Sequence, residues 1–145
     1  MATYENTRSI SVLVAVAGGV AAAAMYRFVT VDPAGAEDFV VKTLVPGANG
    51  AAADGILAMA PDTKVGTGLV ASSMILPDGA QALIELGQNC AKGDLLRAGG
   101  NGAEVDGAAY LADAAGDIIV AKALSAGVVG QIIPVQFYGY RGAVP

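Results

Sequence analysis

The sequence contains no histidine and no tryptophan among its 145 residues. Histidine is the side chain that most often serves as a general base near neutral pH and as a metal ligand. Its absence removes the Ser-His and Cys-His nucleophile pairs and the commonest donor of a metal site. We therefore expect no catalytic residues, no bound metal and no cofactor, and we predict that the chain is not an enzyme.

Cysteine is nearly absent, because Cys90 is the only one. A single cysteine cannot form an intramolecular disulfide, which excludes a small disulfide-stapled secreted scaffold. Lys92 follows two residues later and could lower the pKa of the thiol. Without a histidine or a second cysteine beside it, Cys90 is expected to be a small residue of a loop or core.

Charge is also sparse. Charged residues make up 14% of the chain, whereas about 25% is typical of soluble domains. The few Lys and Arg residues are scattered, and the net charge is -5. Nucleic-acid binding needs a basic patch that neutralises phosphates, so nucleic acid is excluded as an expected partner. A surface with few charges suits a protein that packs against neighbouring proteins.

What the chain has instead is apolar sequence, which amounts to 54% of its residues. The longest apolar run covers residues 10–25 and is shorter than the roughly 20 residues that cross a bilayer as a helix. Alternate residues of its first half fall on one face, which predicts a β-strand over residues 9–16 and no membrane contact. A signal peptide over residues 1–24 is the alternative, although this leader lacks a net positive charge.

Short β-branched or aromatic runs, separated by Gly, Pro, Asn and Asp, continue to the end of the chain. This pattern predicts a mainly β, small single-domain barrel or sandwich, β-tulip-like or similar, with at most one or two short helices. The expected strands are residues 9–16, 25–31, 39–45, 55–59, 82–86, 94–97, 103–105, 117–124 and 131–138. Only residues 68–75 and 108–115 have the composition of a helix. Pro134 is expected to mark an edge strand or a bulge.

The predicted domain spans residues 9–145 and follows an N-terminal arm of residues 1–8. Within it, "GTGLVA" at residues 66–71 matches the letters of a dinucleotide-binding fingerprint but lacks the long helix that must follow. Most carboxylates lie beside Gly or Pro, where Asp usually accepts hydrogen bonds from its own turn. Of Asp54, Asp62, Asp78, Asp94, Asp106, Asp113 and Asp117, all but Asp113 lie beside Gly or Pro.

Aromatic residues gather near the two ends of the chain, in "ATYENTR" and in "QFYGYRGAVP". Chain ends fray unless something holds them, and Tyr and Arg are preferred anchors of protein interfaces. We therefore predict that the partner-binding residues lie at both ends, whereas Phe137 faces the core. They are Tyr4, Asn6, Arg8, Tyr138, Tyr140 and Arg141.

Four segments carry a resemblance that covers nearly the whole chain. They are "SISVLVAVAGGV", "ADGILAMA", "PDGAQALIELGQNCAKGDLLRAGGNGAEV" and "IIVAKALSAGVVGQIIPVQF". Together they resemble the small capsid decoration, or cement, proteins of tailed bacteriophages. The alanine tract at residues 21–24 departs from that family, in which a Gly-Asp turn is expected there.

The resemblance implies a structural protein on the outer surface of the virion head. Such a protein binds the major capsid protein, commonly as a homotrimer, and holds neighbouring capsid subunits together. The family supplies no catalytic residues to carry over. One alternative is a secreted or periplasmic β-domain from which residues 1–24 are removed. Another is a barrel-sandwich carrier or ligand-binding module, but its hairpin tip needs a modifiable lysine, which "GGNG" lacks.

Overall fold

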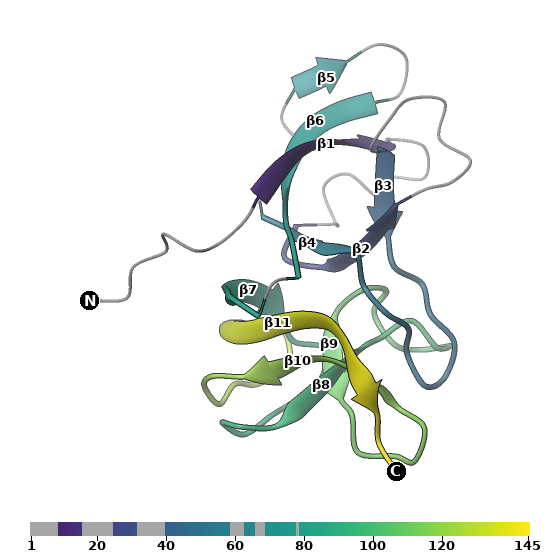
Figure 1. Ribbon diagram of the computed structural model, residues 1–145, viewed down its shortest axis with the longest axis vertical. Coiled ribbons are helices and arrows are strands. Elements are labelled where there is room, and N and C mark those ends of the chain that lie inside the picture. Colours follow the sequence, from purple (N-terminus) through teal and green to yellow (C-terminus); the bar gives the residue numbers. More distant parts are fainter. Residues whose placement is uncertain (1–8, 16–24, 32–39, 59–62, 66–68, 78) are drawn as a thin grey trace.

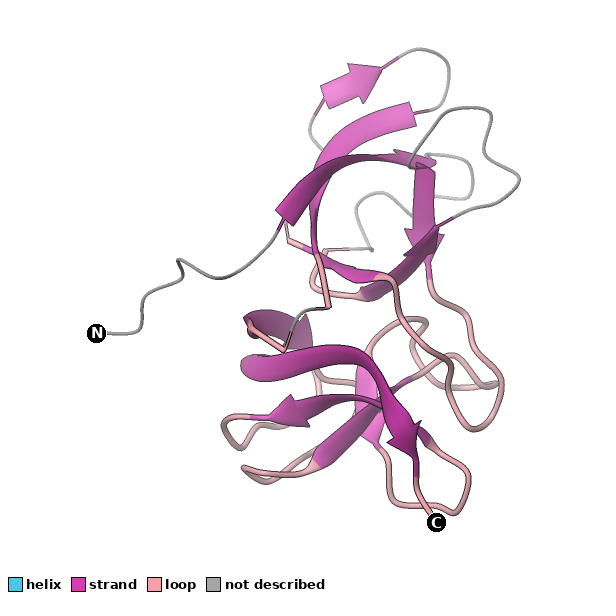
Figure 2. Ribbon diagram, viewed as in Figure 1, coloured by secondary structure: helices cyan, strands magenta, loops and turns pink. Residues whose placement is uncertain are grey.

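The computed structural model consists of strands joined by loops (Figure 1). It describes residues 9–15, 25–31, 40–58, 63–65, 69–77 and 79–145. Figure 2 shows that these residues form no helix. In the same part of the chain, no helical segment has the length and apolar character needed to span a membrane. The expectation of a small, mainly β protein is confirmed.

The first sheet has six strands in the order β1-β3-β2-β4-β6-β5. The strands are β1 (Ser9–Ala15), β2 (Phe28–Val31), β3 (Val40–Thr43), β4 (Gly55–Leu57), β5 (Thr63–Val65) and β6 (Leu69–Ile75). Because β1 also pairs with β6, the pairings lead from β1 through β3, β2, β4 and β6 back to β1. β1 runs parallel to β3, and the other pairs are antiparallel.

The second sheet has five antiparallel strands in the order β7-β11-β10-β8-β9. The strands are β7 (Gln81–Glu85), β8 (Leu95–Ala98), β9 (Ala109–Leu111), β10 (Ile118–Ala123) and β11 (Ile132–Ala143). This sheet lies below the first one in Figure 1 and contains the C-terminal strand. An isolated bridge joins Leu86, just after β7, to Ala109 in β9.

Alternating burial explains why these segments form strands. In β7, Ala82 and Ile84 are buried while Leu83 between them is exposed. In β11, the buried residues Ile133, Val135 and Phe137 alternate with residues that face outward. Period-two patterns of this kind place one face of a strand on the core and the other toward solvent.

The larger of two hydrophobic clusters joins the sheets. Phe28 of β2 and Ile56 of β4 pack with Ile84, Val120 and Phe137 of the second sheet. The rings of Phe28 and Phe137 lie 5.8 Å apart between centroids. Full burial of an Ile or Phe side chain contributes about 1.5–3 kcal/mol. A smaller cluster within the first sheet contains Val29, Val41, Leu57 and Met74.

Backbone contacts also connect the two sheets at the start of β2. The Phe28 N–H donates to the Gly107 carbonyl, and the Glu85 N–H donates to the Tyr26 carbonyl, each at 2.8 Å. The Arg27 side chain forms an ion pair with Glu85. The start of β2 is thereby fixed against the second sheet.

The long apolar run begins as a strand, as its alternation predicts. Residues 9–15 form β1, which pairs with β6 at seven positions from Ser9 with Ile75 to Ala15 with Leu69. The following residues, 16–24, and the predicted arm, 1–8, lie outside the described residues. A mature chain that started near Met25 would therefore lack a strand that both β3 and β6 pair with.

Both expected helices are wrong. Residues 108–115 contain β9, and residues 69–75 form β6. Alanine favours a helix in isolation, but here Ala109 is fully buried and pairs with Ala98 of β8. Small side chains at these positions allow close packing inside a sheet, and this tertiary contact outweighs the local preference. Because Leu69–Ile75 is a strand, "GTGLVA" is not followed by the helix that a dinucleotide site needs.

Two further expectations are corrected in the second sheet. The expected strand at 103–105 is part of the loop between β8 and β9. Pro134 does not mark an edge, because β11 pairs with both β7 and β10. Its carbonyl accepts the Leu124 N–H, so its ring nitrogen points to where β10 has ended at Ala123. The hydrogen bond that the missing N–H would make to the Leu124 carbonyl is therefore lost only at the end of the ladder.

Candidate partner-binding surface

The pairing of β11 with β10 is interrupted by a large bulge. Phe137 pairs with Ala121, and Gly142 pairs with Ile119. Between these pairs, the single residue Val120 lies opposite residues 138–141, which we call the β11 bulge. Bulges bend a strand and re-aim its side chains. Here the extra residues are two tyrosines, a glycine and an arginine.

Gly139 fixes the base of the bulge against the first sheet. Its φ angle is +74°, a left-handed conformation that glycine adopts without strain. Its carbonyl accepts the Ala53 N–H at 2.9 Å. A Cβ at this position would lie 2.6 Å from the Pro77 Cβ and 2.8 Å from the Ala53 carbonyl oxygen. Only glycine permits this approach, so the bulge has a defined position rather than a loose one.

Tyr138 and Arg141 stack on and hydrogen-bond to one another within the bulge. The Arg141 guanidinium carbon lies 4.7 Å from the centre of the Tyr138 ring. Its Nη1 also donates to the Tyr138 hydroxyl at 3.0 Å, and that hydroxyl donates to Oε1 of Gln136 at 2.8 Å. Stacking of a cation on an aromatic face contributes about 0.5–1 kcal/mol at an exposed site. These contacts preorganise the two side chains while Tyr140 beside them stays 61% exposed.

An apolar strip, made of Leu83, Ile132 and Pro134, continues the same outer face. Leu83 and Pro134 are register partners on β7 and β11, and Ile132 lies two residues before Pro134. Leu83 is 44% exposed and Ile132 is 46% exposed. Two more exposed valines, Val128 and Val129, lie in the turn that precedes β11. One face therefore presents aliphatic residues at one end and the tyrosine-arginine bulge at the other.

The structure brings together half of the predicted partner-binding residues. Tyr138, Tyr140 and Arg141 share the β11 bulge, whereas Tyr4, Asn6 and Arg8 lie outside the described residues. Phe137 is fully buried, as predicted. Sequence reasoning missed the apolar strip, although the alternation in "QIIPVQFY" already places Ile132 and Pro134 on one face.

Comparison with known proteins gives the following. No protein-family model matches the chain. No curated protein matches it either. Among solved structures, it is similar to the N base of the head fiber gp8.5 in bacteriophage phi29, with 15% sequence identity and a TM-score of 0.49. The similarity covers 95% of this chain and 99% of that chain. A sequence identity and a TM-score this low do not assign the chain to a family.

A second polar cluster orders the loop between β8 and β9. Arg97 donates from Nη2 to Oε1 of Glu104 at 2.6 Å and from Nη1 to Oε2 at 3.0 Å. Glu104 also accepts the N–H groups of Gly100 and Asn101. These hydrogen bonds, that of Arg97 above all, lower the pKa of Glu104 to about 2. The hydrogen bonds that Arg97 donates to Glu104 in turn raise the pKa of Arg97.

The same arginine reaches a buried carboxylate. Arg97 Nε lies 3.6 Å from Oδ2 of Asp117, which is only 2% exposed and accepts the N–H groups of Asp113 and Ala114. The Arg97 guanidinium also lies over the Tyr110 ring, 5.4 Å from its centre. All its strong contacts are internal, so the cluster stabilises the loop rather than binding a partner. Sequence reasoning missed it, because "GGNG" gives no sign of which side chains surround it.

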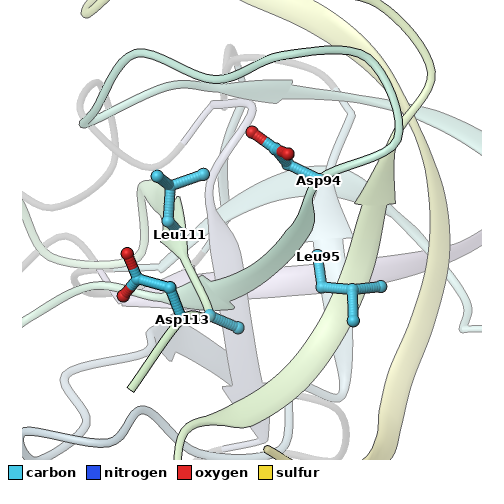
Figure 3. A pocket seen from close by; sticks show the side chains of 5 residues that line it. Asp94, Leu95, Leu111 and Asp113 are labelled. Atoms are coloured by element: carbon cyan, nitrogen blue, oxygen red, sulfur yellow. The ribbon is translucent and has the colours of Figure 1, made fainter.

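Figure 3 shows a shallow pocket of about 100 Å³ lined by Asp94, Leu95, Leu111, Ala112 and Asp113. The carboxylate groups of Asp94 and Asp113 lie apart in it, with the Leu111 side chain between them. Asp94 accepts the Ala91 N–H at 2.8 Å, which is the local turn contact predicted for such residues. In the part of the chain that the structure describes, no three His, Cys, Asp or Glu residues could share a metal ion.

Two sequence expectations about polar residues need correction. The pKa of Cys90 is raised, not lowered by Lys92, because burial and the nearby Asp94 carboxylate both disfavour the thiolate. Asp54 does not accept from its own turn. Its Oδ2 instead accepts the Thr30 hydroxyl and the Val31 N–H at the end of β2.

Proposed function

We propose that this chain is a structural, non-enzymatic decoration protein of a bacteriophage head. In this proposal it binds the major capsid protein on the outer surface of the virion and holds neighbouring subunits together. The observation that carries the proposal is the β11 bulge, in which exposed Tyr140 and preorganised Tyr138 and Arg141 lie beside an apolar strip. The choice of a capsid as the partner comes from the resemblance of the sequence to capsid decoration proteins.

The physical character of this face supports a protein partner. Tyr and Arg are enriched among the residues that dominate binding energy. Preorganised side chains lose less conformational entropy on binding than flexible ones. Arg141 is already stacked on Tyr138, and Gly139 fixes the backbone beneath them. The apolar strip adds area that binding would remove from water, with few charges to desolvate.

We further propose that the protein acts as a homotrimer on the head. Each contact of such an assembly can be weak, because engagement at several sites raises the effective concentration of the remaining ones. A closed shell also presents the same capsid contact many times. Modest affinity at one face therefore suffices for full occupancy of the shell.

Co-sedimentation tests the proposal directly. DNA-filled phage heads are separated on a density gradient, and the amount of this protein is compared with that of the major capsid protein. We expect a fixed ratio, with many copies on every head. Recovery of the protein only in free form would overturn the proposal, and so would a periplasmic form whose N-terminus is Met25.

Substitutions in the apolar strip test which face is used. Leu83→Ser and Val105→Ser form a matched pair, because the two side chains are 44% and 43% exposed. Val105 lies in the loop between β8 and β9, away from the strip. We expect Leu83→Ser to lower occupancy of the heads and Val105→Ser to leave it unchanged. Equal occupancy by both variants would remove this face from the proposal.

A further inference from the structure

Two cations on the outer face of β10 and β11 have no acidic partner among the described residues. Lys122 and Arg141 form no ion pair with any residue that the structure describes. Glu85, an acidic residue facing outward on the neighbouring β7, is already paired with Arg27. The face is therefore locally positive, although the chain as a whole carries a net charge of -5.

These cations belong to one row of four residues, Lys122, Gln136, Tyr138 and Arg141, which we call the donor row. Lys122 is the register partner of Gln136 across the β10–β11 ladder. Side chains at such positions are neighbours, with Cβ atoms about 4.5–5.5 Å apart. Gln136 accepts from the Tyr138 hydroxyl, which accepts from Arg141. Strand register and hydrogen bonds thus link one cation to the other.

The direction of the hydrogen bonds decides what the donor row offers to a partner. Arg141 donates to Tyr138, and Tyr138 donates to Oε1 of Gln136. This uses the side-chain oxygen of Gln136 as an acceptor, and the amide NH₂ group of the same side chain has only donors. Lys and Arg have donors only. The row therefore presents N–H donors and positive charge, and the complementary group is an anionic acceptor.

We infer that the donor row binds an acidic polypeptide segment of the partner, whose carboxylates receive hydrogen bonds from Lys122, Gln136 and Arg141. This inference rests on the proposed function for the identity of the partner. A carboxylate accepts a pair of parallel N–H bonds from a guanidinium, and such charge-assisted bonds are stronger than neutral ones. Nucleic acid is a poorer match, because two cations on a chain of net negative charge neutralise few phosphates.

The test uses NMR titration of the full chain with poly-L-glutamate. Signals of the Arg141 Nε–H, the Gln136 side-chain amide and the Lys122 backbone are followed. We expect shifts confined to the donor row and its neighbours. Lys122→Ala combined with Arg141→Ala is expected to weaken binding about tenfold, since exposed ion pairs contribute modestly one by one.

Lys92→Ala is the matched control, because Lys92 is an exposed lysine in the turn before β8. It removes one positive charge from outside the donor row and should leave the titration unchanged. Arg141→Lys keeps the charge but loses the paired guanidinium donors, so we expect it to bind more weakly than wild type and more tightly than Arg141→Ala. Equal weakening by Lys92→Ala would overturn the inference. Equal shifts with a DNA oligonucleotide of the same charge would also overturn it, because the row would then bind anions without preference for carboxylates.

Measuring how much protein binds to phage heads distinguishes the failure of this inference from the failure of the proposed function. If wild-type protein and the Lys122→Ala/Arg141→Ala variant occupy heads equally, the inference fails and the proposed function stands. If poly-L-glutamate binds the donor row but the protein does not occupy heads, the proposed function fails. The inference that the donor row binds carboxylates would then still hold.

Discussion

At the scale of single residues, Gly139 has the clearest predicted effect. Alanine at this position has to adopt a φ angle of +74° and places its Cβ 2.6 Å from Pro77. Strain in this region of backbone conformation costs about 1–3 kcal/mol, and the clash adds to it. We expect Gly139→Ala to lower the free energy of unfolding by about 2 kcal/mol or more, as measured by urea denaturation.

Gly130→Ala is the matched control for that substitution. Gly130 has a φ angle of +84°, and a Cβ there meets nothing within 4 Å. It therefore carries the conformational strain without the clash, and we expect a smaller loss of stability. An equal loss of unfolding free energy in the two variants would show that the contact with Pro77 does not contribute to stability.

Glu104 gives the protein a defined response to acid. Its pKa is about 2 in the folded chain, below its ordinary value near 4.5, mainly because of the hydrogen bonds from Arg97. A lowered pKa stabilises the fold above the unfolded-state value, and this contribution is lost as the pH falls from about 5 toward 2. A shift of this size corresponds to about 3 kcal/mol. Unfolding of wild type and Glu104→Gln should therefore differ most at neutral pH and converge near pH 2, whereas parallel curves would contradict the prediction.

At the scale of elements, the predicted N-terminal arm can be tested apart from the sheets. Deletion of residues 2–8 removes no described strand, because β1 begins at Ser9. We expect the shortened chain to stay folded, with an unchanged midpoint in thermal unfolding, and to occupy phage heads less well. Equal occupancy by the shortened and full chains would remove the arm from the binding surface.

Strands were predictable where a period-two pattern coincides with a buried face. β7 and β11 show this pattern, and they overlap the expected ranges 82–86 and 131–138. β9 was not predictable, because alanine-rich sequence favours a helix until the surrounding sheet is known. β6 was missed because its small residues have the composition of a helix, and the three residues of β5 are too few to show an alternating pattern.

The sequence predicts the residue types of the candidate site but not how they are brought together. Tyr138, Tyr140 and Arg141 could be chosen from residue type and their place near the chain end. The bulge that gathers them depends on the register between Phe137 and Ala121 and between Gly142 and Ile119. Register across strands is a tertiary property, so neither the bulge nor the nearness of Lys122 to Gln136 follows from the sequence alone.

At the scale of the whole molecule, the proposal concerns the stability of a shell rather than of one chain. A protein that bridges capsid subunits should raise the temperature at which filled heads release DNA. We expect heads without this protein to release DNA at a lower temperature, and re-addition of the protein to restore the higher one. A DNA-binding dye reports the release. Unchanged release temperatures would show that the protein binds without reinforcing the shell.

The pairing of β1 with β6 has a consequence for how the chain is made. Ser9 pairs with Ile75, so β1 cannot pair with β6 until residues that are synthesised much later have been made. Contacts between distant residues form slowly, and unpaired strand edges invite aggregation meanwhile. While the ribosome is still making β6, the newly made β1 lacks that antiparallel partner. Chaperones that bind nascent chains are expected to matter most in this interval.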